Sequence, residues 1–277
     1  MTLSDFTARR NTFRRLHESG CFVIANPWDI GSACYLQHLG FQALATTSAG
    51  FAFSRGLADA AVPRDAMLTN IAEIVGAVKL PVNADFESGY ANDPEGVAAN
   101  VRLCVETGVA GLSIEDNARD SRQPLYELPL AVERIRAARA AIDASGSGVM
   151  LTARAECYLV GHPDAFTESL RRLHAYAEAG ADVLYAPGVY QRREIETMVA
   201  ALAPKPVNIL ISRNTGLTVA DLAALGVRRI SVGSSLARVA WASFMRAAQT
   251  IAKEGSFAGF DDIVPFAEIN NFFSLPN

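Results

Sequence analysis

Several features that assign proteins to a class are missing from this chain of 277 residues. No apolar run approaches the ~18 residues that a membrane-spanning helix needs. The formal net charge is −4, so the composition lacks the basic excess typical of proteins that bind nucleic acid or anionic membranes. We therefore expect a small-molecule partner, with no nucleic acid and no membrane involved.

Cysteine is scarce and unpaired in the sequence. Cys21, Cys34, Cys104 and Cys157 form no CxxC motif and lie in apolar stretches, as reduced core thiols do. The first twenty residues carry several arginines in a helical pattern and lack the apolar core of a signal peptide. These features predict a cytoplasmic protein.

The chain does contain a regular alternation of short apolar runs and longer segments of helical period. Half of the residues are hydrophobic and 19% are charged, which is enough to bury a large core. Eight runs have the length and β-branched content of strands, at residues 21–28, 43–50, 81–87, 111–116, 149–156, 183–188, 206–212 and 229–234. Between them lie Ala-rich helical segments such as 94–108, 128–146 and 163–180.

Eight strand–helix units predict an α/β fold, namely a (β/α)8 TIM barrel. The alternative is an open doubly wound sheet, which would usually carry a GxGxxG turn after its first strand, and "NPWDIGSA" has none. We expect a single domain over residues 1–277. An N-terminal helix at 3–19 and a C-terminal helical arm at about 257–277 would extend it.

Acidic residues follow several of the predicted strands, at the end where barrel enzymes hold their active sites. Asn83, Asp85 and Glu87 alternate along one strand, so the two acids are predicted to share its inward face. Further carboxylates follow other strands: Asp29, Asp59, Glu115 and Asp116. Taken singly, each acid is equally a helix cap or a solvated loop charge, Asp29 and Asp116 above all. Together they predict a Mg²⁺ site, with Mn²⁺ possible, because hard oxygen ligands suit these ions.

Arg154 brings the opposite charge to the same end, where it is expected to bind a carboxylate of the substrate. A structural ion pair with Glu115 or Glu156 is the alternative. A Schiff-base aldolase is excluded because the only lysines are Lys79, Lys205 and Lys253, none at an active end. No two histidines have the spacing of a zinc pair.

Six motifs, in order, resemble the isocitrate lyase and phosphoenolpyruvate mutase superfamily: "NPWDIGSA", "TTSAG", "GLAD", "NADFESGYAND", "GLSIEDN" and "LTARAE". The resemblance implies a barrel that acts on α-oxo acids or their enolates with Mg²⁺. It also implies a homotetramer, a dimer of dimers, in which a C-terminal helix is exchanged between subunits.

The resemblance also implies residue roles. The metal-side acids fall on Asp59, Asp85, Glu87 and Glu115, and the catalytic set on Ser48, Asp59, Glu115 and Arg154. The family's oxyanion and carboxylate contacts fall on Ser48, Ala49 and Arg154. We further expect substrate contacts from Gly50, Asp85, Arg119, Arg122 and Asn208. Glu87 departs from the family, which commonly has Asp there.

The loop "NARDSRQPLYELP" departs further, because it lacks the cysteine that serves as catalytic acid in the lyases and the lysine of the phosphonopyruvate enzymes. We expect a lid whose arginines, Arg119 and Arg122, bind an anionic group. The enolate would take its proton from water or from a residue elsewhere, with Tyr185 and His162 as candidates. The predicted function is cleavage or rearrangement of a C–C bond next to the carbonyl of a small α-oxo acid. The alternatives are P–C bond chemistry on phosphonopyruvate and an oxo-acid-binding barrel without turnover.

Overall fold

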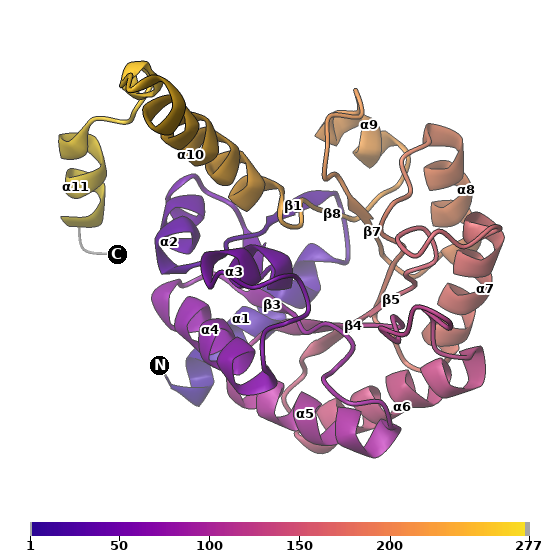
Figure 1. Ribbon diagram of the computed structural model, residues 1–277. Coiled ribbons are helices and arrows are strands. Elements are labelled where there is room, and N and C mark those ends of the chain that lie inside the picture. Colours follow the sequence, from indigo (N-terminus) through magenta and orange to yellow (C-terminus); the bar gives the residue numbers. More distant parts are fainter. Residues whose placement is uncertain (1, 275–277) are drawn as a thin grey trace. The chain divides into compact units, whose positions relative to one another are not determined.

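The computed structural model describes residues 2–274, and its larger part is a closed barrel of parallel strands (Figure 1). The strands follow one another around the ring in chain order: β1 (Phe22–Ala25), β2 (Ala43–Ala45), β3 (Val82–Asp85), β4 (Gly111–Glu115), β5 (Met150–Arg154), β6 (Val183–Tyr185), β7 (Val207–Leu210) and β8 (Arg229–Ser231). The ring closes where Val23 of β1 pairs with Ile230 of β8. The predicted (β/α)8 barrel is confirmed, and an open sheet is excluded.

Helices connect successive strands and lie outside them, as Figure 1 shows for α4 to α8. Their bounds are α1 (Leu3–Leu16), α2 (Ile30–His38), α3 (Ser48–Ser54), α4 (Arg64–Ala77), α5 (Pro94–Glu106), α6 (Leu128–Ala144), α7 (Ala165–Glu178), α8 (Arg192–Leu202) and α9 (Val219–Ala224). None of the described helices is long and apolar enough to cross a membrane.

The local sequence accounts for these helices, and α5 shows how. Asp93 caps its N-terminus by accepting a hydrogen bond from the Gly96 N–H at 2.7 Å, and Pro follows at the first helical position. Val97, Val101 and Cys104 recur at spacings of three and four and are fully buried, so one face of the helix packs on the barrel.

Helix α1 fills the end of the barrel at which the strands begin. Phe13 is fully buried and packs with interior residues of several strands, among them Phe22 and Met150. Gly111 makes this approach possible, because a Cβ there would lie 2.7 Å from the Phe13 ring. With this end closed, ligands reach the interior from the opposite end.

His17 of the same segment gives a testable pH dependence of stability. Burial, with the nearby Arg229 charge second, lowers the pKa of His17 to about 3. The unfolded chain therefore binds a proton that the folded chain excludes, and stability falls as pH drops from ~6.5 towards 3. Between pH 7 and pH 5 this histidine should remove roughly 2 kcal/mol of unfolding free energy. In urea titrations, His17→Gln should lose less stability over that interval than the native protein, whereas the exposed control His174→Gln should match the native slope.

The described residues from Ser235 onward form a second compact unit, which contains α10 (Ser235–Glu254), a short 3₁₀ helix (Ala258–Phe260) and α11 (Phe266–Ser274). The C-terminal arm was predicted to begin only at about residue 257. Within this unit the 3₁₀ helix packs closely on α10, since a Cβ on Gly259 would lie 2.8 Å from the Ala247 Cα.

Candidate active site

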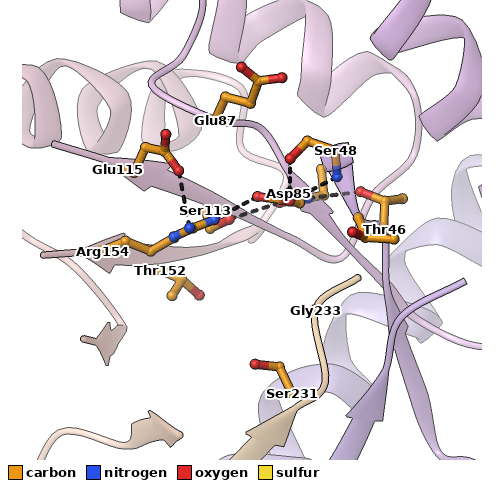
Figure 2. Close-up of polar contacts among 12 residues, drawn as sticks. Thr46, Ser48, Asp85, Glu87, Ser113, Glu115, Thr152, Arg154, Ser231 and Gly233 are labelled. Atoms are coloured by element: carbon orange, nitrogen blue, oxygen red, sulfur yellow. Dashed lines mark hydrogen bonds and ion pairs between the residues drawn. The ribbon is translucent and has the colours of Figure 1, made fainter. Parts of the chain in front are cut away.

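Asp85, the last residue of β3, is held by a set of hydrogen bonds from neighbouring strand ends. The N–H and hydroxyl of Ser48 donate to its Oδ2 at 2.9 and 2.8 Å, and its own N–H donates to Thr46 Oγ1 at 2.9 Å. Arg154 donates to the other oxygen, Oδ1, at 2.8 Å. Figure 2 shows Asp85 between Ser48 and Arg154. Both carboxylate oxygens are thereby fixed in direction.

Arg154, the last residue of β5, binds three carboxylates at once. Besides Asp85, it contacts Glu115 at 3.1 Å and Glu156 at 2.9 Å. Burial favours the neutral guanidine, but the three acids outweigh it and raise the pKa of Arg154 above its ordinary value. Arg154 therefore forms the structural ion pairs that were the alternative to its binding a substrate carboxylate. In this structure the protein's own acids occupy it.

Glu87 and Glu115 form the outer part of the acid cluster, and Arg119 of the following loop bridges them. Arg119 Nη2 lies 2.8 Å from Glu115 and 3.4 Å from Glu87. Tyr90 donates to Glu87 at 2.8 Å. Burial, together with the neighbouring acids, raises the pKa of Glu87 to about 7, and burial is also the main cause that raises the pKa of Glu115.

The prediction that Glu87 shares the inward strand face with Asp85 is wrong. The strand β3 ends at Asp85, and Glu87 has a φ of +47° in the turn that follows. The left-handed backbone turns its side chain towards Tyr90 and Arg119 instead.

Two of the six predicted acids have structural roles. Asp29 caps α2 by accepting from the Ser32 N–H at 2.7 Å. Asp116 is buried and holds Arg172 at 3.1 Å and the Tyr176 hydroxyl at 2.6 Å, away from the cavity. Asp29 is therefore the helix cap that was its alternative role, whereas Asp116 is a buried ion-pair partner, a role that was not predicted.

A cavity of about 160 Å³ opens at the strand C-terminal ends. A cavity of similar size holds a molecule such as benzene, so this one suits a small acid. Of the predicted site residues, it is lined by Ser48, Ala49, Asp59, Asp85, Arg154, Tyr185 and Asn208. It is also lined by Asn83, which was predicted to lie on the inward strand face, and by polar residues that were not assigned to the site from the sequence: Asn26, Thr46, Thr47, Ser113, Arg229, Ser231 and Ser234. These residues could have been identified from the sequence, because polar side chains at inward positions of apolar strands are unusual.

Other predicted residues lie elsewhere. The Gly50 N–H donates to Thr47 Oγ1 at the start of α3, so it does not face the cavity. Arg122 pairs loosely with Asp120 at 3.7 Å and its side chain is 91% exposed. His162 accepts from the Asp164 N–H in its own loop. Of the two predicted proton donors, only Tyr185 reaches the cavity.

The donor set of this region fits a hard divalent cation, although no group of three or more His, Cys, Asp or Glu within residues 2–274 is already gathered as a metal site. Asp59 and Asp85 line the same cavity, and Mg²⁺ commonly takes one or two carboxylates and keeps several waters. Among the described residues, the acids Asp59, Asp85, Glu87, Glu115 and Glu156 outnumber the cations paired with them, Arg119 and Arg154. Burial is the main cause that raises the pKa of Glu87 to about 7 and that of Glu156 to about 8, so a bound cation would displace protons from this cluster.

The loop after β4, which was predicted to act as a lid, folds as a hairpin. Asn117 and Leu125 form an antiparallel bridge, and the Ala118 N–H donates to the Pro124 carbonyl at 2.8 Å. Arg119 has a φ of +58°, a conformation that directs its side chain to the acid cluster. Arg119 and Arg122 were predicted to have the same role, but their positions in the structure are not equivalent.

Arg119→Ala should weaken the binding of oxalate measured by calorimetry at saturating Mg²⁺. The change leaves Glu87 and Glu115 without their shared cation, which makes the site more repulsive to an anion, and a charge-assisted contact is typically worth ~1.5 to 3 kcal/mol. Arg122→Ala is the matched control and should change the affinity less than about twofold, because its side chain is exposed. Equal losses in the two variants would show that the loop closes on the ligand with both arginines.

Comparison with known proteins agrees with this geometry. The family model for phosphoenolpyruvate phosphomutase matches residues 13–252. A structure of a candidate lyase/mutase from Burkholderia cenocepacia J2315 is 45% identical, with a TM-score of 0.95 over 99% of both chains. An uncharacterised protein of Mycobacterium tuberculosis (strain CDC 1551 / Oshkosh) is 33% identical over 80% of this chain and 82% of its own.

A more distant structural neighbour is oxaloacetate acetylhydrolase in complex with its product oxalate. It is 27% identical, with a TM-score of 0.85 over 98% of this chain and 95% of that one. The chain therefore belongs to the phosphoenolpyruvate phosphomutase family and, with it, to the isocitrate lyase/phosphoenolpyruvate mutase superfamily of lyases and phosphonomutases.

Proposed function

We propose that this protein cleaves or rearranges a C–C bond next to the carbonyl of a small α-oxo acid, through an enolate, with bound Mg²⁺ or Mn²⁺. One observation carries the proposal: Asp85 lines a cavity for a small molecule while Ser48 and Arg154 hold both of its oxygens. An oxygen-ligand site beside hydrogen-bond donors is the arrangement that stabilises an oxyanion.

Asp85 and Asp59 would hold the cation from the cavity side, and Glu87 and Glu115, which share Arg119, would bind its waters. When bound, the cation withdraws electrons from the keto oxygen as the bond next to the carbonyl breaks.

The chain's own side chains supply the remaining steps. The N–H and hydroxyl of Ser48 donate to Asp85 in this structure, and they would turn to the oxygen on which negative charge develops once Asp85 binds the cation. Arg154 keeps a fixed positive charge beside Asp85, since three acids hold its guanidinium in place.

Tyr185 is the proton donor to the enolate carbon in this proposal. It lines the cavity, and its ring lies 5.2 Å from the Arg154 guanidinium carbon. Burial is the main cause that raises the pKa of Tyr185 to about 12, so the phenol keeps its proton at neutral pH. A phenol can give this proton to a carbanion formed next to it.

The proposal is tested by product release from oxaloacetate and 2-methylisocitrate with Mg²⁺. Pyruvate, followed by proton NMR, should appear from at least one of them faster than from the same mixture with an Asp85→Asn protein, which corrects for metal-catalysed decay. Equal rates with the two proteins for every acid would contradict the lyase proposal and favour a binding protein without turnover.

P–C bond chemistry on phosphonopyruvate is a second candidate, favoured by the family-model match over residues 13–252. Phosphorus NMR distinguishes it, because a phosphonate signal would convert to that of a phosphate ester or of free phosphate. Conversion that needs the intact Asp85 would replace the C–C proposal.

We further propose that the second unit carries an assembly surface and that the protein is a homotetramer. Several large apolar side chains of this unit are exposed, among them Phe266 at 84%, Ile263 at 62% and Ile269 at 49%. Such a concentration is unusual on a monomer surface.

Replacing both Phe266 and Ile269 by Asp should therefore shift sedimentation velocity from a tetramer to smaller species at micromolar concentration. The control Asn271→Asp adds one charge at an exposed polar position of the same helix and should leave the species unchanged. A native protein that sediments as a monomer would contradict the assembly proposal.

A further inference from the structure

A second buried arginine lies inside the barrel, deeper than the acid cluster. Arg229 is the first residue of β8, is 3% exposed and lines the cavity. Its strand position is level with Phe22 of β1 and Asn208 of β7, whereas Asp85 and Arg154 end their strands. Arg229 therefore belongs to the floor of the cavity rather than to its rim.

The partners of Arg229 are all uncharged. Its Nε donates to Asn208 Oδ1 at 2.8 Å and its Nη2 to Thr152 Oγ1 at 3.0 Å. Its Nη1 lies 3.4 Å from His17 Nε2. His17 Nδ1 faces the Phe13 carbonyl at 2.8 Å and must carry the ring proton, because a carbonyl oxygen only accepts. His17 Nε2 is then the acceptor of the contact with Arg229, and the imidazole is neutral.

Arg229 differs from the other buried arginines in having no acid partner while lining the cavity. Arg10 and Arg134 also lack an ion pair among the described residues, but they donate to backbone carbonyls and do not line this cavity. Arg154 has three carboxylates and Arg172 has two, Asp116 and Glu168. No carboxylate within residues 2–274 forms an ion pair with Arg229. Burial lowers the pKa of Arg229 to about 10, with only Tyr185 acting against it, so the group stays charged at neutral pH.

A buried charge without a counter-charge costs several kcal/mol. The guanidinium has five N–H donors, and the three contacts above use one on each nitrogen, which leaves one N–H on each terminal nitrogen without a partner among the described residues. Two parallel N–H groups are the geometry that a carboxylate accepts.

Charge along the barrel axis adds a direction to this site. The rim has the acids that would hold the cation, whereas the floor has one cation without a counter-charge. The oxo-acid end of a ligand would therefore bind beside the metal at the rim, and a second carboxylate would be attracted to the floor. The ends of a ligand are thereby distinguished, with the oxo-acid end beside Asp85 and the other end beside Arg229.

We propose that Arg229, with Asn208 and Thr152 positioning it, is a subsite for a second carboxylate, so that the ligand is a dianionic oxo acid of about four carbons. This inference rests on the proposed function for the placement of the oxo-acid end. A subsite at the floor of the cavity would make the protein bind dicarboxylates more tightly than monocarboxylates.

The test compares two stable acids that differ only at one end, racemic malate and racemic 2-hydroxybutyrate, by calorimetry in one Mg²⁺ buffer. The native protein should bind malate at least tenfold more tightly. In Arg229→Met the affinity for malate should fall to that for 2-hydroxybutyrate, while the affinity for 2-hydroxybutyrate changes less than about twofold. The control Arg228→Met removes a neighbouring cation that bonds to the Gly20 carbonyl and does not line the cavity, and it should keep the malate preference.

Equal affinities for the two acids in the native protein would overturn the subsite without any variant. A preference that survives in a folded Arg229→Met protein would overturn it as well. Should Arg229→Met not fold, Arg229→Lys keeps the charge, and loss of the preference there with thermal stability intact would show that the paired N–H groups matter. Failure of the proposed function gives a different result, because absent turnover would leave the malate preference in place.

Discussion

Asp85→Asn should abolish the Mg²⁺-dependent binding of oxalate, with a loss of affinity of at least about 100-fold. The amide keeps the size of the carboxylate but removes the charge that Arg154 and Ser48 orient into the cavity. Removing even the outer partners of a metal typically costs 10- to 100-fold, so a direct ligand should cost at least as much. Calorimetry with and without Mg²⁺ measures the change.

Asp65→Asn is the matched control for this loss, since its side chain is 79% exposed and pairs only with Arg64. It should bind oxalate as the native protein does. Unchanged oxalate affinity in Asp85→Asn would remove Asp85 from the metal site and shift attention to Glu87 and Glu115.

Arg154→Gln should lower the unfolding free energy by about 3 to 5 kcal/mol, in addition to any loss of turnover. Three carboxylates depend on this guanidinium, and removal of one partner of a buried ion pair leaves the other charges uncompensated. Urea denaturation with the midpoint and slope both fitted measures the change.

The exposed pair of Arg136 and Glu133 supplies the control for Arg154. Both side chains are 55% exposed, so Arg136→Gln should cost less than about 1 kcal/mol. A similarly small cost for Arg154→Gln would mean that the three acids are protonated or solvated in the native protein, against the ion-pair network described here.

The barrel was predictable because its signals are local. Each strand is a short apolar run and each helix repeats at three and four residues, and alternation of the two leaves little choice of topology. Asp85 was predictable for the same reason, since it ends an apolar strand on the inward face. The position of Glu87 was predicted wrongly because the strand ends two residues before it. A glutamate in the sequence gives no indication that its backbone will adopt a positive φ.

The pairing of the site charges depends on contacts between distant residues, which no short pattern records. Arg154 and Asp85 are 69 positions apart, and the sequence gives no reason to choose three acids for one guanidinium. Arg229 was overlooked because an arginine at the start of a strand normally lies in solvent. Only the closure of that end by α1 buries it beside His17.

The central claim is that the site is complementary to an enolate rather than to the oxo acid itself. Oxalate has the charge and shape of the pyruvate enolate, so the ratio of the pyruvate and oxalate dissociation constants, measured at saturating Mg²⁺, tests this claim most directly. The account predicts that oxalate binds at least about 100-fold more tightly than pyruvate. Equal affinities would contradict it, because a site that does not prefer the enolate has no means of lowering the barrier to its formation.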